Sequence, residues 1–343
     1  MTDYFLRRLL VMVPTLLGIT LVTFVVINLA PGGPMEQMLQ QIRFGAAESG
    51  GGSSGGITHE GVSGETLEEL RRQFGYDKPL LSRYLHWLGN LLRLDFGTSF
   101  VHDEPAFGVI RSKFPVSLQF GIASFILTYL ICVPLGILKA VRDGTWVDQG
   151  TSLLVYAGYA ISPLMLGILL IVLFGGGTFL AWFPISGSVS DHYELLGPWE
   201  ALWDRLHHAV LPLACYLIGN FATLTLLTKN AFLEQLRQPY VATARAKGLS
   251  RRQVHYGHVL RNALIPIVTG LGAFLGVFFV GNLFIEQIFS LDGMGLLFYN
   301  ALLARDYPVL LGILTLVSLT LMLGNLLSDL LYVWVDPRID YNR

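Results

Sequence analysis

The stretch FPVSLQFGIASFILTYLICVPLGIL, from Phe114 to Leu138, holds no charged residue and lies between Lys113 and Lys139. A helix rises about 1.5 Å per residue, so about 20 predominantly apolar residues cross the roughly 30 Å hydrocarbon core of a bilayer. This stretch is long enough to cross, and it contains no charge that the hydrocarbon would have to accommodate. It therefore predicts a transmembrane helix.

Five more stretches of the same character predict five more spans. Each of these stretches has charged residues near its ends. The stretches cover residues 9–30, 151–174, 206–228, 262–285 and 307–328. The first apolar run exceeds the roughly 7–15 residues of a signal-peptide core, so we expect a membrane anchor there. The chain is therefore predicted to be an all-α membrane protein with six transmembrane helices.

The composition agrees with a membrane protein. Of the 343 residues, 53% are hydrophobic and 14% are charged, whereas a soluble domain carries roughly 25% charged residues. The formal net charge of −1 provides no basic field for nucleic acid, so we expect no nucleic-acid partner. Cys132 and Cys215 both lie inside apolar runs, which argues against a disulfide framework and against a zinc site.

The distribution of Lys and Arg predicts the orientation in the membrane. If the N-terminus is cytoplasmic, the cytoplasmic pieces hold thirteen basic residues, and the short outer loops hold only Arg205 and Arg305. Basic residues concentrate in cytoplasmic loops. Both termini are therefore predicted to be cytoplasmic.

Three segments follow from these spans. Residues 1–30 form the N-terminal transmembrane helix, residues 31–113 form a periplasmic segment, and residues 114–343 form the core with five spans. Within the periplasmic segment, residues 45–65 are rich in Gly and Ser and cannot bury enough apolar area to offset their ordering entropy, so we expect a flexible loop. Residues 79–94 have leucines at helical spacing, and two interpretations stay open: a helix on the membrane surface, or one packed on the spans.

The cytoplasmic loop of residues 229–262 is the most unusual segment. Pro239 interrupts it, and residues 240–247 can then form two helical turns. Gly248 suits the left-handed position just past a helix end. Ser250, with Gln253 three residues later, has the spacing of a capping box. The loop is therefore predicted to fold as a helix, a glycine turn and a second helix.

The composition of this loop suggests a docking element for another protein. Small side chains at Ala242, Ala244 and Ala246 permit close approach of a partner, and nearby Lys and Arg supply charge. The alternative is a basic loop that touches anionic lipid. The candidate docking residues are Ala242, Thr243, Ala244, Arg245, Ala246, Lys247, Gly248, Leu249 and Ser250.

The sequence lacks the motifs that catalysis and nucleotide binding would need. No lysine follows a glycine, so the chain has no Walker A phosphate cradle. We expect no catalysis, no bound metal and no cofactor on this chain. A self-sufficient secondary transporter would need coupling-ion sites and inverted repeats. An intramembrane enzyme would need a positioned nucleophile and base. The sequence shows neither set of features.

The string YVATARAKGLS, from Tyr240 to Ser250, resembles the EAA-x-x-x-G coupling motif of binding-protein-dependent ABC importer permeases. It is most similar to the version in the dipeptide/oligopeptide/nickel family, with Ala242 where the generic motif has glutamate. Further strings support this resemblance along nearly the whole chain. They include Ala30-Pro-Gly-Gly-Pro34, Asp95-Phe-Gly97, Phe183-Pro-Ile-Ser-Gly187, Glu286-x-x-Phe-Ser290 and Asp336-Pro-Arg338. Within the family, the chain resembles most the peptide permease subunit of the microcin C uptake type.

The resemblance implies a type I ABC importer permease fold in the bacterial inner membrane, crossed several times. It implies a second homologous permease subunit, one or more ABC ATPase subunits that bind ATP and Mg²⁺, and a periplasmic peptide-binding protein. The implied function is ATP-driven import of peptides, either oligopeptides or peptide antibiotics such as microcin C. Nickel or another small solute is the alternative cargo within this class. The candidates for the translocation path are Ser162, Pro163, Asn220 and Asn282.

Overall fold

The computed structural model describes residues 2–29, 78–175, 179–269 and 281–335. Within these ranges the chain is helical, apart from turns and one isolated antiparallel bridge between Thr98 and Pro105. The chain divides into two compact units. Unit 1 comprises Met1–Leu10, Lys113–Leu297 and Val317–Arg343, and unit 2 comprises Val11–Ser112 and Phe298–Leu316. The predicted flexible loop, residues 45–65, lies outside the described residues.

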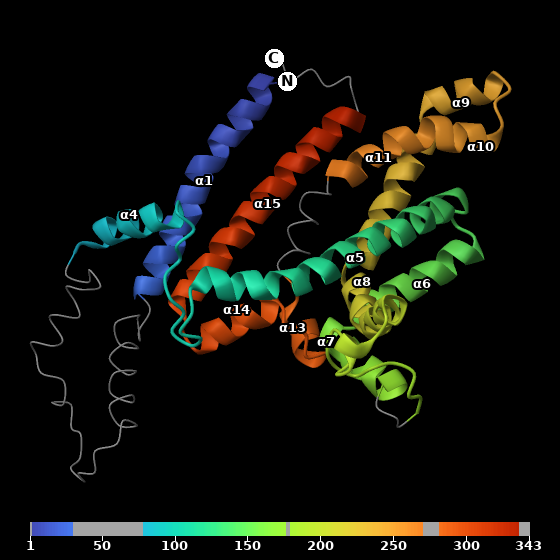
Figure 1. The fold of residues 1–343 in the computed structure, drawn as a ribbon. Coiled ribbons are helices and arrows are strands. Elements are labelled where there is room, and N and C mark those ends of the chain that lie inside the picture. Colours follow the sequence, from blue (N-terminus) through green and yellow to red (C-terminus); the bar gives the residue numbers. More distant parts are fainter. Residues whose placement is uncertain (1, 30–77, 176–178, 270–280, 336–343) are drawn as a thin grey trace, which may run out of the picture. The chain divides into compact units, whose positions relative to one another are not determined.

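Unit 2 contains most of α1 (Thr2–Leu29) and all of α4 (Leu80–Leu91). These helices lie side by side in Figure 1 and join through aromatic contacts. The Phe24 ring lies 5.6 Å from the Tyr84 ring and 5.7 Å from the Trp87 ring, and the Tyr84 hydroxyl lies 2.9 Å from the Thr20 hydroxyl. Of the two interpretations of residues 79–94, packing on a span is therefore observed for α4. Its Leu81 side chain remains exposed.

Unit 1 contains the remaining helices, in whole or in part. They are α5 (Ala106–Val141), α6 (Trp146–Ala160), α7 (Pro163–Leu170) with the π-helix η1 (Ile171–Gly175), the 3₁₀ turn η2 (Tyr193–Leu195), α8 (Pro198–Leu236), α9 (Pro239–Ala246), α10 (Arg251–Gln253), the π-helix η3 (Val254–Val259), α11 (Leu260–Thr269), α13 (Leu283–Ile288), α14 (Met294–Leu303) and α15 (Tyr307–Val335). Both α14 and α15, like α1 and α5, contribute residues to both units.

Four described helices are long and apolar enough to cross a membrane: Leu6–Leu29, Ala106–Val141, Pro198–Leu236 and Tyr307–Leu330. A fifth span is formed if the pair Trp146–Ala160 and Pro163–Gly175, bent by 98°, counts as one.

The stretch predicted as a span at 151–174 is therefore bent. The reason is local: Pro163 disfavours helical backbone at Ser162 and cannot donate a backbone hydrogen bond. The stretch predicted as the fifth span, 262–285, begins in α11 and passes through residues 270–280, which lie outside the described ranges.

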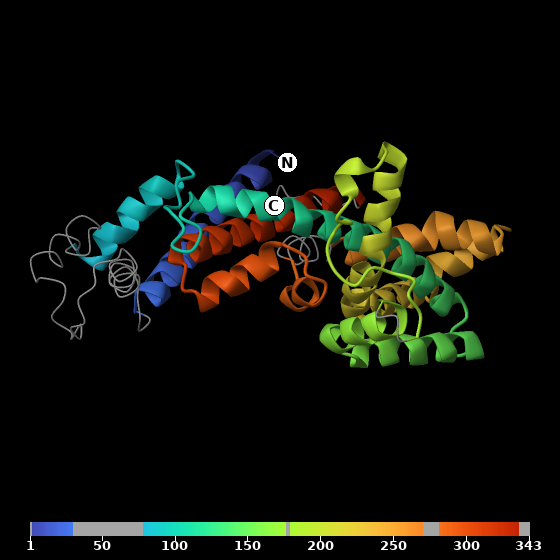
Figure 2. The same cartoon turned by 60° about the horizontal axis from the view of Figure 1, so that its bottom comes forward.

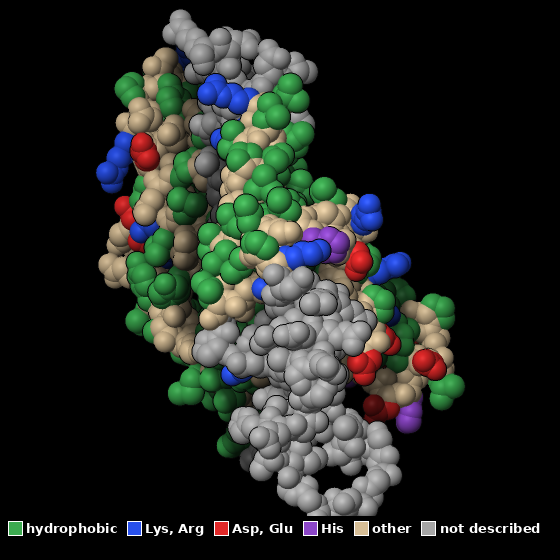
Figure 3. Space-filling view, turned by 90° about the vertical axis from the view of Figure 1, so that its left-hand side faces the viewer, with side chains coloured by type: hydrophobic (Ala, Val, Ile, Leu, Met, Phe, Trp, Pro, Cys, Tyr) green, Lys and Arg blue, Asp and Glu red, His purple; other side chains and the backbone are tan. Residues whose placement is uncertain are grey.

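Many apolar side chains of the described helices are exposed, and Figure 3 shows them over much of the visible face. Examples are Leu10, Val22, Leu130 and Leu153. A soluble protein rarely leaves so large an apolar surface uncovered, whereas lipid tails cover such a surface at no cost.

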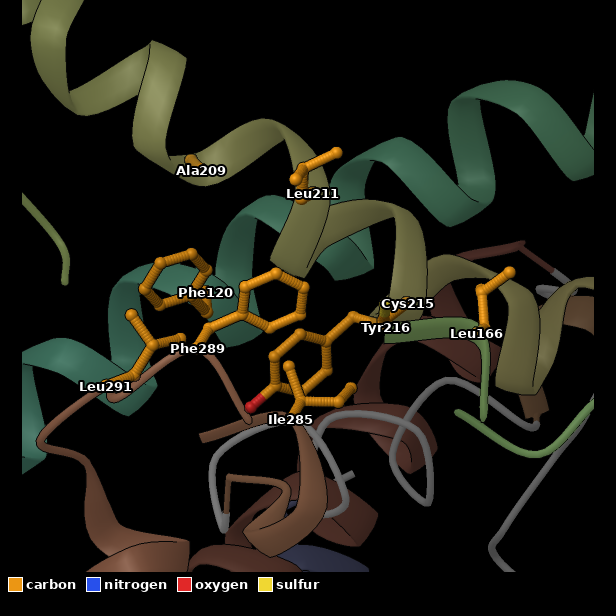
Figure 4. Packing of buried hydrophobic residues seen from close by; sticks show 9 residues of the cluster. All are labelled: Phe120, Leu166, Ala209, Leu211, Cys215, Tyr216, Ile285, Phe289 and Leu291. Carbon is orange, nitrogen blue, oxygen red and sulfur yellow. The ribbon is translucent and has the colours of Figure 1, made fainter. Parts of the chain in front are cut away.

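The interior of unit 1 includes an apolar cluster where α5, α7, α8 and α13 meet (Figure 4). The rings of Phe120 and Tyr216 stack with centroids 6.3 Å apart, beside Phe289 and Ile285. This cluster packs α7, which begins just after the bend at Ser162, against α8 and α13.

Candidate functional site

The loop of residues 229–262 folds as the sequence predicts, with helix bounds shifted by one residue. The first short helix, α9, runs from Pro239 to Ala246, and the predicted range was 240–247. Proline suits the first position because the N–H it lacks would have no partner within the helix. In Figures 1 and 2, α9 lies beside α10 and α11, close to the end of α8.

Gly248 makes the turn after α9. Its φ is +84°, the left-handed conformation that the sequence predicts there. The N–H of Gly248 donates to the Arg245 carbonyl at 3.0 Å, and the N–H of Leu249 donates to the Ala244 carbonyl at 3.4 Å. This pair of bonds is the Schellman arrangement, which satisfies carbonyls that a helix end leaves free. No atom lies within 4 Å of the position that a Cβ at Gly248 would take.

Ser250 starts the second helical segment with the predicted capping box. Its hydroxyl accepts a bond from the Gln253 N–H at 3.4 Å, and the Gln253 side-chain oxygen accepts one from the Ser250 N–H at 2.9 Å. From there the chain continues as α10, η3 and α11 without a break. The helix, glycine turn and helix are therefore confirmed.

The two faces of α9 have different environments. Val241 and Ala244 are buried in a cluster with Phe232 of α8 and residues of α5, η3 and α11. Ala242 and Ala246 are exposed. The prediction of one partner-facing surface with all three alanines is therefore wrong at Ala244. Residues two apart point to nearly opposite sides of a helix, whereas residues four apart share a side.

The exposed side of this loop is strongly basic. The exposed cations of α9, the glycine turn and α10 are Arg245, Lys247, Arg251 and Arg252. In the adjoining η3, the ring of His255 packs edge-on against the ring of Phe232, with the two ring centroids 6.0 Å apart. Burial, together with the positive charges of Arg245 and Arg251, lowers the pKa of His255, so the neutral form is favoured. The surface thus combines small side chains with four positive charges, which suits a partner with acidic groups.

The four path candidates lie on, or directly before, three helices that meet at the apolar cluster of Figure 4. Ser162 and Pro163 form the start of α7 at the bend, and Asn220 is half-buried on α8. Asn282 precedes α13, where its side-chain oxygen accepts the N–H groups of Phe284 and Ile285. The Asn282 N–H donates to the Tyr216 hydroxyl at 3.0 Å. Asn282 is thus a helix cap, and the role of all four in a path stays a prediction.

The family model described as "Binding-protein-dependent transport system inner membrane component" matches residues 132–341. The chain belongs to this family.

Curated relatives match along the whole length of this permease. The peptidoglycan transport system permease protein YejB of Agrobacterium fabrum is 46% identical, covering 100% of this chain and 99% of the relative. The inner membrane ABC transporter permease protein YejB of Escherichia coli O157:H7 is 40% identical, covering 99% of each chain. The oligopeptide transport system permease protein AppB of Bacillus subtilis is 35% identical, covering 99% of this chain and 100% of the relative.

A solved structure supports the fold. A chain from the MetNI methionine ABC transporter, in an inward-facing conformation, superposes with a TM-score of 0.50 at 17% identity. The superposition covers 66% of the permease and 96% of that chain. The permease is therefore a multi-pass inner membrane component and a transport subunit without catalysis of its own. Membership implies an ATPase and a binding protein as partners.

Sequence reasoning missed a buried carboxylate of the permease. Glu286 of α13 is buried, and its two oxygens accept bonds from the Ser117 hydroxyl at 2.9 Å and from the Leu296 N–H at 2.8 Å. Glycines enclose it: a Cβ at Gly281 would lie 2.2 Å from its Oε1, and one at Gly293 would lie 2.6 Å from its Cδ. The glycine spacing around a single acid was the available signal. These contacts tie α5 to α13 and α13 to the start of α14.

Proposed function

We propose that the chain is the transmembrane permease subunit of an ATP-driven ABC importer that moves peptides from the periplasm to the cytoplasm. The observation that carries this proposal is similarity over the whole chain to permeases of peptide transport, such as AppB, whose name specifies oligopeptides. The name of the Agrobacterium relative specifies peptidoglycan, a polymer that itself contains short peptides. Microcin C-type peptide antibiotics belong to the proposed cargo, and nickel or another small solute is the alternative.

The proposed architecture is the six-span, type I permease fold with both termini cytoplasmic. The described helices supply four or five spans, and residues 262–285 are proposed to supply the remaining one. The proposed segments are 1–30, 31–113 and 114–343. The basic loop of residues 229–262 then lies in the cytoplasm, as expected from the excess of Lys and Arg there.

The proposed ATPase-docking surface is α9 with its glycine turn, within residues 242–250. Ala242 and Ala246 share an exposed side, and the space around Gly248 is open. Ala244 supports the surface from beneath, because it is buried against the permease itself. The positive charges of Arg245 and Lys247 would meet acidic groups of the ATPase, which steer and orient such contacts.

The proposed assembly has four kinds of component. This permease pairs with a second, homologous permease, and the two enclose the path to which Ser162, Pro163, Asn220 and Asn282 are assigned. ATPase subunits beneath them bind ATP and Mg²⁺, and a periplasmic peptide-binding protein delivers the cargo. Membrane lipid covers the exposed apolar helices.

Uptake by the reconstituted complex tests this proposal. Proteoliposomes that contain both permeases and the ATPase would receive the binding protein, a labelled peptide and internal or external ATP. We expect peptide transport only when ATP is on the ATPase side and the binding protein is on the opposite side. Equal uptake without ATP, driven by an ion gradient, would instead establish a secondary transporter.

A further inference from the structure

Two lysines and two aspartates form a charge cluster in unit 1 near the cytoplasmic ends of its long helices. The cluster consists of Lys139 on α5, Asp143 in the α5–α6 turn, Asp148 on α6 and Lys229 on α8. The formal charges cancel. The cluster joins the consecutive helices α5 and α6 to α8, which is distant in sequence, at a point two helical turns before α8 ends at Leu236.

Each charge in the cluster has specific partners. The side chain of Lys139 is 0% exposed, and its Nζ lies 3.1 Å from Asp148 Oδ1. The same Nζ donates to the Thr151 hydroxyl at 3.1 Å and to the Ser152 hydroxyl at 2.6 Å. Lys229 Nζ lies 2.7 Å from Asp148 Oδ2 and 2.8 Å from Asp143 Oδ1. Asp148 therefore holds one lysine with each oxygen.

A cluster of this kind contributes more to geometry than to stability. Burying charges costs solvation free energy that their mutual attraction barely repays, so apolar residues would often stabilise the site as well. What the ion pairs add is a defined register, because Asp148 binds a lysine of α5 with one oxygen and a lysine of α8 with the other. Here the register that they fix is that of α6 against α8.

Close packing beside the cluster makes the cytoplasmic end of unit 1 one block. Gly136 of α5 is pressed against α8: a Cβ there would lie 2.6 Å from the Thr228 Cβ and 2.8 Å from the Thr225 carbonyl oxygen. One turn further, Ala140 of α5 shares a buried cluster with Phe232 of α8 and with the buried side of α9. A displacement of α9 therefore moves the ends of α5 and α8 with it.

Asp148 connects this block to the bent span. It lies in the first turn of α6, which runs for 15 residues to Ala160 and ends at the 98° bend before Ser162. A 15-residue helix spans about 22 Å. Any movement of the block thus reaches the bend through a rigid helix, at the site where two path candidates lie.

We propose that Lys229 and Asp148 are positioning residues that transmit movement of the ATPase-docking helix α9 into α6 and so to the bend at Ser162. The inference rests on the proposed docking role of α9. The Lys229–Asp148 ion pair is the mechanical link between α8 and α6. Without this ion pair, α9 still binds the ATPase, but α6 no longer moves together with α9.

The test measures peptide uptake per ATP hydrolysed in the reconstituted complex. Lys229→Met removes the charge and keeps an unbranched side chain, and we expect about a tenfold lower ratio, within the range typical of coupling between sites, with the ATPase subunit still co-purifying. Lys229→Arg should restore the ratio. Arg142→Met is the matched control, because it removes a nearby exposed cation outside the cluster. A purely structural role would lower the yield and melting temperature of the complex and leave the ratio unchanged.

The outcomes separate this inference from the proposed function. If Lys229→Met and Arg142→Met differ by less than about twofold in uptake per ATP, the proposed coupling role of the Lys229–Asp148 ion pair is refuted. Should Lys229→Met fail to fold, the double variant Lys229→Met with Asp143→Asn replaces it, because this variant leaves Lys139 and Asp148 as a balanced pair. A lower uptake per ATP in the double variant than in Arg142→Met then supports the inference, and an equal uptake per ATP refutes it. If Gly248→Val in the same assay keeps its ATPase subunit and full uptake, the docking role of α9 is refuted, whatever Lys229→Met shows.

Discussion

Replacing Gly248 with valine should detach the ATPase from the permease. The native φ of +84° is one that side chains other than glycine adopt at a cost of about 1–2 kcal/mol, and a β-branched residue is among the worst suited. No atom lies within 4 Å of the added Cβ, so this cost is backbone strain and not a clash. Strain of about 1–2 kcal/mol lowers the equilibrium constant for forming the native turn roughly 5–30-fold.

The Gly248→Val assay combines peptide uptake with co-purification of the ATPase subunit. We expect both to fall, while membrane insertion stays normal, because the turn lies outside the spans. Gly248→Asn should be milder, since asparagine tolerates the left-handed conformation. Gly97→Val is the matched control: Gly97 has a φ of +93°, and its added Cβ would meet only ordinary contacts at 3.7 Å and beyond. Normal ATPase binding by Gly248→Val would refute the reasoning, and so would equal loss in Gly97→Val.

Three further predictions concern loop 229–262 and the buried carboxylate. Ala244→Leu should lower stability by about 1–3 kcal/mol through overpacking, whereas Ala242→Leu should weaken ATPase binding at unchanged melting temperature; equal melting temperatures for the two variants would contradict this. Glu286→Ala should cost about 1–3 kcal/mol, because it leaves the buried Ser117 hydroxyl without its acceptor, and an unchanged melting temperature would count against that role. The pKa of His255 is lower when folded than when unfolded, so the stability that the neutral ring contributes is lost as pH falls below the unfolded pKa of about 6.5. The melting temperature should therefore fall less between pH 7.5 and 5.5 in His255→Gln than in the wild type. Melting temperatures that depend on pH identically in the two proteins would exclude this effect.

Features decided by a few neighbouring residues could be predicted from the sequence. The turn at Gly248 and the cap at Ser250 depend only on backbone preferences and on hydrogen bonds within three to five residues, so they were predicted correctly. The apolar runs were equally readable, because length and hydrophobicity alone decide whether a helix can span. The bend at Ser162 is likewise local, because Pro163 disfavours helical backbone at the residue before it, but the size of the bend depends on how the two halves pack.

Features that depend on packing between distant segments could not be predicted. Which side of α9 the permease itself covers is decided by Phe232 and the surrounding helices, so the burial of Ala244 was missed. The partners Asp148 and Lys229 lie 81 residues apart, and nothing local to either indicates the other. The same is true of Ser117 and Glu286, 169 residues apart.

Site-specific crosslinking from α9 tests the docking surface most directly. Both native cysteines, Cys132 and Cys215, are buried, so Ala246→Cys introduces an exposed thiol that can be labelled selectively with a photo-crosslinker. In the assembled transporter, we predict a crosslink from position 246 to the ATPase subunit, and none from the exposed Leu81→Cys on α4. Crosslinking of position 246 to lipid alone, with the ATPase bound and active, would contradict the account.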